Sequence, residues 1–222
     1  MPTVLFVHNG SPGRFAFLAA ALLRRGWRGA LINGPEGREL PGVTTVRWHS
    51  ARDATPGVFA VAARSEVDLI RGRAAAQAAV QLKAEGFQPD LIIGHPGWGE
   101  MAFLREVFPT ARQIQVGEYY SRVRGGDTGF DYEFESKSFD AIGACGNNAV
   151  LAMSLAEADR IVVPTQYQAS LFPRVFLPRI AVIHEGIDTG KTRPQPSARF
   201  ELPSGQLLDR SRAGCHIRQP VF

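Results

Sequence analysis

One segment of the 222-residue chain, Gly94–Glu100, combines an imidazole, an indole and a carboxylate with three glycines. An apolar run at residues 91–93 precedes it, and a helical pattern follows it. Glycines let a ligand approach the backbone closely. An imidazole titrates near neutral pH and can accept a proton or a hydrogen bond from a hydroxyl group. We therefore expect His95 to be catalytic and Gly97 and Trp98 to bind substrate. The alternative for Trp98 is a ring that only covers the core.

A second polar segment, Glu118–Arg124, follows another apolar run and carries a carboxylate, two phenols and two guanidinium groups. These groups could form one wall of a polar binding site, so we expect Glu118, Tyr119 and Arg122 to bind substrate. The long loop that follows has the length of a binding or lid segment. Its acids fit a solvated loop better than paired acid and base groups; they are Asp127, Asp131, Glu133 and Glu135.

The segment Gly10–Gly13 lies between a predicted strand and a predicted helix. Backbone N–H groups and the positive end of a helix suit a phosphate or another anion. We expect Gly10, Ser11 and Gly13 to bind such a group; the alternative is a turn that only reverses the chain. The segment has half of the dinucleotide fingerprint, and Glu36 is the single candidate acid for a ribose, so dinucleotide binding is not expected.

Other chemical motifs are absent or incomplete. Gly186–Thr192 resembles a phosphate-binding P-loop but has one residue too few between its glycines, and Pro194 and Pro196 prevent the helix that should follow. No nucleophile elbow of the G-x-S-x-G type occurs. No cluster of His, Cys and Asp has metal-ligand spacing, so we expect no metal site.

Short apolar runs that alternate with helical patterns predict the elements that position these residues. Near-continuous Val, Ile and Leu runs are typical of parallel strands covered on both faces. Right-handed crossovers then predict an α/β fold, a doubly wound, mostly parallel, Rossmann-like sheet of about seven strands with helices on both faces. Strands are expected at residues 3–8, 30–33, 43–48, 90–94, 113–117, 160–164 and 179–184, and helices at 14–25, 58–85, 101–107, 139–158 and 166–176, the last interrupted at Pro173.

In such sheets a ligand lies beyond the carboxyl ends of the strands, where the strand order reverses. The segments after the last two strands also reach this edge. We therefore add Thr165, Glu185 and Gly186 to the expected substrate-binding residues, on their position alone.

The composition is that of a globular protein, with 45% hydrophobic and 21% charged residues. The longest apolar run, residues 15–23, is far shorter than the roughly 20 residues of a membrane span. The N-terminus lacks a secretory signal pattern, and Cys145 and Cys215 offer neither a disulfide framework nor a zinc ribbon, so a cytoplasmic protein is expected. The net charge of +4 favours anionic ligands or an acidic membrane surface, and the scattered basic residues predict no nucleic-acid partner.

Four segments, in this order, resemble the N-terminal domain of family 4 glycosyltransferases. They are Ile93–Glu100, Glu118–Tyr120 with Phe130–Phe134, Pro164–Gln168 with Phe172–Pro173, and Val182–Thr189. The resemblance extends over about residues 3–210. It implies a retaining, nucleotide-sugar-dependent enzyme of the GT-B architecture, in which two Rossmann-like domains enclose a cleft. The first domain mainly holds the acceptor and the second mainly holds the donor.

Carried over by position, the resemblance implies that Gly10–Gly13 faces the donor diphosphate or the acceptor. It implies that His95 faces the reacting sugar and that Glu118 and Tyr119 line the acceptor side. Gly186–Asp188 would lie at the domain junction. No cofactor is implied besides the nucleotide-sugar donor, which is a co-substrate.

After Asp188 the chain has only a tail, in which residues 200–208 still resemble the family's interdomain segment and the residues beyond Arg212 do not. We expect residues 3–188 to form the Rossmann-like N-terminal domain, and 189–222 an interdomain segment and an irregular tail, with the second domain missing. The expected function is to bind a sugar or lipid-linked acceptor, with a separately encoded donor-binding domain as a partner and peripheral contact with the inner membrane face at most. As a truncated product the chain would be inactive alone. The alternative is a stand-alone carbohydrate- or phosphate-binding module without catalysis.

Overall fold

The structure is a computed structural model that describes residues 1–10, 13–122, 143, 146–193, 195, 198–205 and 207–208. Ser11 and the acids predicted to lie in the loop after Arg122 fall outside the described residues. The chain divides into two compact units, Met1–His184 and Glu185–Phe222. In the second unit, β8 (Phe200–Glu201) pairs antiparallel with β9 (Leu207–Leu208).

The first unit is built on one seven-stranded sheet with the order β3-β2-β1-β4-β5-β6-β7, in which every pair is parallel. The strands are β1 (Thr3–His8), β2 (Arg28–Asn33), β3 (Thr44–Arg47), β4 (Leu91–Gly94), β5 (Arg112–Val116), β6 (Arg160–Val163) and β7 (Ile180–Val182). The order reverses between β1 and β4, so the segments after these two strands flank the crevice typical of doubly wound sheets.

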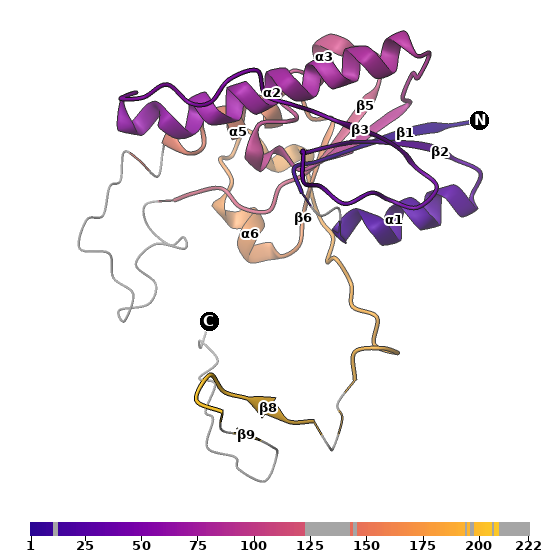
Figure 1. The fold of residues 1–222 in the computed structure, drawn as a ribbon, viewed down its shortest axis with the longest axis vertical. Coiled ribbons are helices and arrows are strands. Elements are labelled where there is room, and N and C mark those ends of the chain that lie inside the picture. The colour runs from indigo at the N-terminus through magenta and orange to yellow at the C-terminus, as the bar shows by residue number, and fades with distance from the viewer. Residues whose placement is uncertain are drawn as a thin grey trace. The chain divides into compact units, whose positions relative to one another are not determined.

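Helices cover both faces of this sheet (Figure 1). They are α1 (Gly13–Arg24), α2 (Ala60–Ala84), α3 (Leu104–Val107), α5 (Ala149–Ala156) and α6 (Gln166–Leu171), with 3-10 turns η1 (Pro96–Trp98) and η3 (Leu177–Arg179). Alternate residues of β1 face opposite layers: Leu5 packs in a core cluster with Ala75 of α2, and Phe6 packs with Phe15 of α1. The predicted doubly wound, Rossmann-like α/β fold is thereby confirmed.

The long helix α2 lies close to the sheet because its inner face carries small side chains, including Ala74, Ala75, Ala78 and Ala79. Gly72 continues this face towards the turn after β4. A Cβ atom at Gly72 would lie 2.6 Å from the carbonyl oxygen of Gly99, so only glycine permits this approach.

Several predicted boundaries are wrong by a few residues. The helix predicted at 166–176 with an interruption at Pro173 ends at Leu171, where Phe172 is extended with ψ 145°, and only its continuation to residue 176 is wrong. The reason is Pro173, because a proline disfavours helical backbone at the residue before it. The predicted helix at 101–107 is reduced to Leu104–Val107. Within the described part of the chain, no helix is both long and apolar enough to span a membrane.

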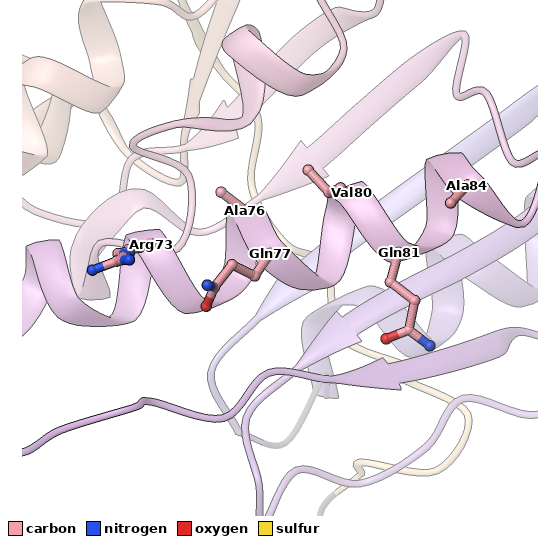
Figure 2. A pocket seen from close by; sticks show the side chains of 6 residues that line it. All are labelled: Arg73, Ala76, Gln77, Val80, Gln81 and Ala84. Atoms are coloured by element: carbon pink, nitrogen blue, oxygen red, sulfur yellow. The ribbon is translucent and has the colours of Figure 1, made fainter.

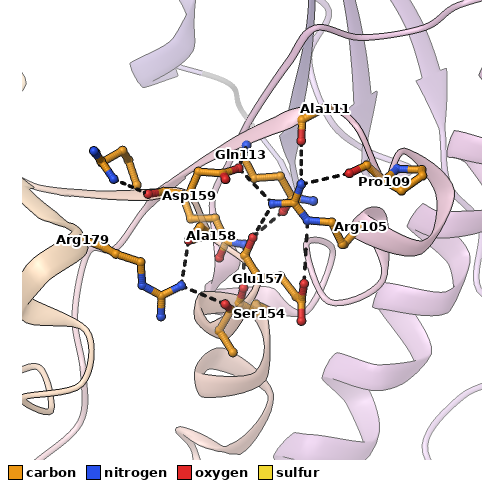
Figure 3. A network of polar contacts seen from close by, with 12 residues as sticks. Arg105, Pro109, Ala111, Gln113, Ser154, Glu157, Ala158, Asp159 and Arg179 are labelled. Atoms are coloured by element: carbon orange, nitrogen blue, oxygen red, sulfur yellow. Dashed lines mark hydrogen bonds and ion pairs between the residues drawn. The ribbon is translucent and has the colours of Figure 1, made fainter.

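A polar network ties the amino ends of β5 and β6 together (Figure 3). Arg105 of α3 donates to the carbonyl oxygens of Ala111 and Glu157, each at 2.7 Å, and to Asp159 Oδ2 at 2.9 Å. The same carboxylate oxygen of Asp159 accepts the Gln113 N–H at 2.7 Å. Hydrogen bonds from backbone and arginine lower the pKa of Asp159 against the opposing effect of desolvation. These residues lie at the end of the sheet opposite to the crevice and support the fold.

Candidate functional site

The predicted catalytic residue His95 follows β4 directly and is 8% exposed. Its Nδ1 accepts a hydrogen bond of 3.2 Å from the Gly97 N–H, and its Nε2 lies 3.0 Å from Glu118 Oε2. Because Nδ1 is an acceptor, the proton of the neutral ring belongs on Nε2, which donates it to the Glu118 carboxylate. Segments after two neighbouring strands thus meet in one hydrogen-bonded pair.

Within this pair, Glu118 is the accessible member. Its side chain is 49% exposed, whereas both ring nitrogens of His95 are engaged inside the protein. In this conformation a ligand hydroxyl group has no unoccupied nitrogen of His95 to bind. The predicted catalytic role of His95 stays a prediction. In the structure the ring contacts the Glu118 carboxylate and orients it.

The backbone around Glu118 is fixed by two amide side chains. Gln168 donates its Nε2 to the Glu118 carbonyl oxygen at 2.8 Å. Thr165, predicted to bind substrate, caps α6 by accepting the Gln168 N–H at 3.1 Å, and so contacts this segment through Gln168. Asn148 accepts the Ser121 N–H at 2.9 Å and donates to the Ser121 carbonyl oxygen at 2.8 Å.

A cavity of about 190 Å³ opens at this point. Its volume is below the ~300–1,000 Å³ of pockets that enclose drug-sized ligands. It brings five predicted site residues together: His95, Gly97, Trp98, Glu118 and Tyr119. The other lining residues are Arg64, Pro96, Ser121, Asn147, Asn148 and Leu151. We call this cavity, with its lining, the edge pocket.

Sequence reasoning missed Arg64, which enters the edge pocket from α2. Its Nε lies 2.9 and 2.8 Å from the two carboxylate oxygens of Asp68, and its Nη2 donates to the Gly97 carbonyl oxygen. The guanidinium carbon lies 4.9 Å from the centre of the Trp98 ring, and that of Arg71 lies at 5.7 Å. Trp98, which is 40% exposed, therefore makes two cation–π contacts at the rim of the pocket.

Asn147 and Asn148 were also missed. An asparagine just before a helix usually signals an N-cap, and Asn148 holds that position for α5. Its side chain makes no capping hydrogen bond and binds the backbone of Ser121 instead. The sequence offers no signal that distinguishes these two uses of the same residue.

A completely buried carboxyl group lies behind the turn that carries His95. Glu100 is 0% exposed, and within the described ranges neither of its carboxylate oxygens receives a hydrogen bond from another residue. Burial raises the pKa of Glu100 to about 7, against the opposing charge of Arg71. Burial also raises the pKa of Asp68, with Arg64 acting against the shift.

Five predicted site residues lie elsewhere or are engaged. Arg122 donates its Nε to the Leu171 carbonyl oxygen at 2.5 Å and lies over the Tyr120 ring, so it closes the end of α6. The Gly10 N–H is bonded to His8 Nδ1 at 3.0 Å, so in this conformation it does not point at an anion. Gly13 begins α1 and is exposed. Glu185 and Gly186 belong to the second unit, and their site role stays a prediction.

A larger hollow of about 470 Å³ runs along the outer face of α2 (Figure 2). Its lining comes from one helix and consists of Arg73, Ala76, Gln77, Val80, Gln81 and Ala84. Its lining, as far as the structure describes the chain, holds a single charged group and no acid or imidazole, so volume alone does not make it a reaction site. Within the described residues, no group of three or more His, Cys, Asp or Glu side chains could hold a metal ion.

The comparisons with known proteins bear on the family and the fold. The family model described as the glycosyl transferase family 4 group matches residues 25–192. No curated protein sequence matches the chain. The starch synthase IV catalytic domain from Arabidopsis thaliana is 13% identical with a TM-score of 0.49, over 86% of this chain and 52% of that one.

Two further solved structures are similarly distant. The UDP-glucosyltransferase from Polygonum tinctorium is 13% identical with a TM-score of 0.46, over 88% of this chain and 55% of that one. MurG from Acinetobacter baumannii is 13% identical with a TM-score of 0.43, over 83% of this chain and 44% of that one. The chain thus spans about half the length of the solved proteins it matches.

The family match covers more than half of the chain. It includes α2 with Arg64, the turn with His95, and Glu118, which together form most of the edge pocket. The resemblance expected from the sequence is confirmed by this match. The chain belongs to the glycosyl transferase family 4 group.

Proposed function

We propose that this domain binds the acceptor of a glycosyl transfer reaction in the edge pocket. The observation that carries the proposal is the Glu118–His95 pair, which places an oriented, half-exposed carboxylate in a cavity of about 190 Å³. A carboxylate accepts hydrogen bonds from hydroxyl groups, and Ser121 and Asn147, which also line the edge pocket, offer further polar atoms. Such a wall suits one polyhydroxylated ring.

The proposed part of the reaction is to bind and orient a hydroxyl group. Glu118 accepts the hydrogen bond of the acceptor hydroxyl, and His95 keeps the carboxylate in place through its Nε2–H. Holding two reactants in a productive geometry is worth up to ~7–11 kcal/mol. The acceptor in this proposal is a sugar or a lipid-linked sugar, and the donor is a nucleotide-sugar that reacts with retention.

We further propose that donor binding needs a second domain that closes over the carboxyl edge of the sheet. Charge that develops on a leaving diphosphate needs preorganised donors around it. Among the described residues, Arg64 is the single arginine or lysine that lines the edge pocket, and its guanidinium is already bonded to Asp68 and Gly97. The described pocket therefore suits an acceptor better than a diphosphate.

Saturation-transfer NMR on the full chain tests the acceptor proposal. The probes are the methyl glycosides of glucose, mannose, galactose and N-acetylglucosamine. We expect at least one to bind, and Glu118→Gln to weaken its binding about tenfold, because a hydrogen bond to a charged group is lost. The matched control is Glu106→Gln, an exposed carboxylate on α3 outside the pocket, which should leave binding unchanged. Equal losses in both variants, or no binding of any glycoside, would contradict the proposal.

A further inference from the structure

Arg64 is held in a single orientation by a buried partner on its own helix. Its Nε lies within 2.9 Å of both oxygens of Asp68, which is 3% exposed and lies one helical turn away. Asp68 itself lies in a close contact between helix and turn, because a Cβ atom at Gly99 would meet the Asp68 carbonyl oxygen. The contacts with Asp68 therefore fix the position of the Arg64 guanidinium group.

The same guanidinium group also contacts the turn that follows β4. Its Nη2 donates to the Gly97 carbonyl oxygen, and its guanidinium lies over the Trp98 ring. Arginine presents several donors in a rigid planar fork, so one side chain can bind a carboxylate and a carbonyl at once. Arg64 thus holds the turn to α2 through a hydrogen bond and a cation–π contact, and Arg71 lies over the same Trp98 ring.

Gly97 links the Arg64 contact to the imidazole ring of His95. While its carbonyl oxygen binds Arg64, its N–H donates to His95 Nδ1 at 3.2 Å. A Cβ atom at Gly97 would lie 2.6 Å from His95 Cε1, which shows how closely this backbone approaches the ring. The position of Gly97 therefore determines whether His95 Nδ1 receives a hydrogen bond from the Gly97 N–H.

The donor at Nδ1 selects the tautomer. With the Gly97 N–H in place, the neutral ring carries its proton on Nε2 and donates to Glu118. If Gly97 moved away, the ring could carry its proton on Nδ1. An unprotonated Nε2 would then face a carboxylate oxygen 3.0 Å away without a hydrogen bond between them.

We propose that Arg64 is a positioning residue, which fixes the tautomer of His95 through Gly97 and so orients the Glu118 carboxylate. It contacts the turn rather than the reacting atoms, and it acts through the relay Asp68, Arg64, Gly97, His95, Glu118. The purpose of the relay rests on the proposed function, because Glu118 binds the acceptor hydroxyl there. The relay itself can be tested without any sugar.

The test measures the ring nitrogens of His95 by ¹⁵N NMR on the full chain at pH 8, with the signals assigned through His95→Gln. The wild type should show the Nε2–H tautomer. Arg64→Met should show a substantial Nδ1–H population, because the Gly97 carbonyl oxygen loses its donor. Arg73→Met, an exposed arginine on the same helix, is the matched control and should keep the wild-type signals. A folded Arg64→Met protein with an unchanged tautomer would overturn the proposal.

If Arg64→Met does not fold, Arg64→Lys decides. An ammonium group is a single point charge and cannot reproduce the two-sided fork, so a mixed tautomer is expected. A purely Nε2–H ring in Arg64→Lys would overturn the proposal.

Glycoside binding in the same samples separates this inference from the proposed function. An unchanged tautomer, with sugar binding that still depends on Glu118, contradicts the relay alone. A shifted tautomer in a protein whose wild type binds no glycoside supports the relay and contradicts the proposed function.

Discussion

Glu118 and Glu100 place the same functional group in opposite environments. Glu118 is half exposed and bonded to His95, whereas Glu100 is completely buried, without a hydrogen bond from another residue within the described ranges. The imidazole donates a hydrogen bond to the Glu118 carboxylate, and about half of that side chain faces solvent. Desolvation disfavours the ionised form of Glu100. The exposed acid is therefore suited to bind ligand, and the buried acid makes stability depend on pH.

Burial raises the pKa of Glu100 from 4.5 to about 7. Between these two pH values the folded protein binds more protons than the unfolded chain, so the free energy of unfolding falls as pH rises. The loss amounts to at most about 3 kcal/mol. Glu100→Gln removes this titration, so its stability relative to the wild type should improve between pH 5 and pH 8. Urea unfolding at both pH values measures the difference.

Glu106→Gln, at an exposed carboxylate, is the control for this series and should follow the wild-type pH dependence. Parallel stability curves for Glu100→Gln and the wild type would show that Glu100 does not titrate in this window.

At the level of elements, the approach of α2 to the turn after β4 builds one side of the edge pocket. A glycine inside a helix normally costs about 1 kcal/mol relative to alanine. Gly72→Ala should nevertheless destabilise the protein by about 1–3 kcal/mol, because the new Cβ would lie 2.6 Å from the backbone oxygen of Gly99. Denaturant unfolding measures the change. A more stable Gly72→Ala protein would show that this contact is looser than described.

Much of this arrangement could be predicted from the sequence. Apolar runs bounded by Gly, Pro and His identified the seven strands, and the parallel topology brought His95 and Glu118 to one edge. The sequence pattern could not show which groups each polar side chain contacts. Arg64 is one of several arginines in an Ala-rich helix, and its partners lie four and 33 residues away. Arg122 looked like a ligand contact, but its donor satisfies the Leu171 carbonyl oxygen.

In the first unit as a whole, a polar network supports the fold at the amino ends of the strands, and the edge pocket lies at their carboxyl ends. The polar network at the amino edge depends on Arg105, which donates to backbone carbonyl oxygens and to Asp159 (Figure 3). Arg105→Ala should lower the free energy of unfolding by about 2 kcal/mol, because these acceptors lose a charged donor. Glycoside affinity should stay unchanged, since the edge pocket lies at the other end of the strands. Urea unfolding and saturation-transfer NMR measure the two effects.

Arg73→Ala, at an exposed arginine on α2, is the matched control for the loss of an arginine side chain and should alter neither quantity. A tenfold loss of glycoside affinity in Arg105→Ala would show that the two edges are coupled.

The place where a sugar binds decides whether the edge pocket is the acceptor site. The most direct measurement follows the backbone amide resonances of the ¹⁵N-labelled chain while a binding methyl glycoside is added. The predicted result is a set of shifts confined to His95, Gly97 and Trp98, to residues 118–121 and 147–151, and to Arg64. Shifts confined to the outer face of α2, from Arg73 to Ala84, or no shifts with any glycoside, would contradict the account.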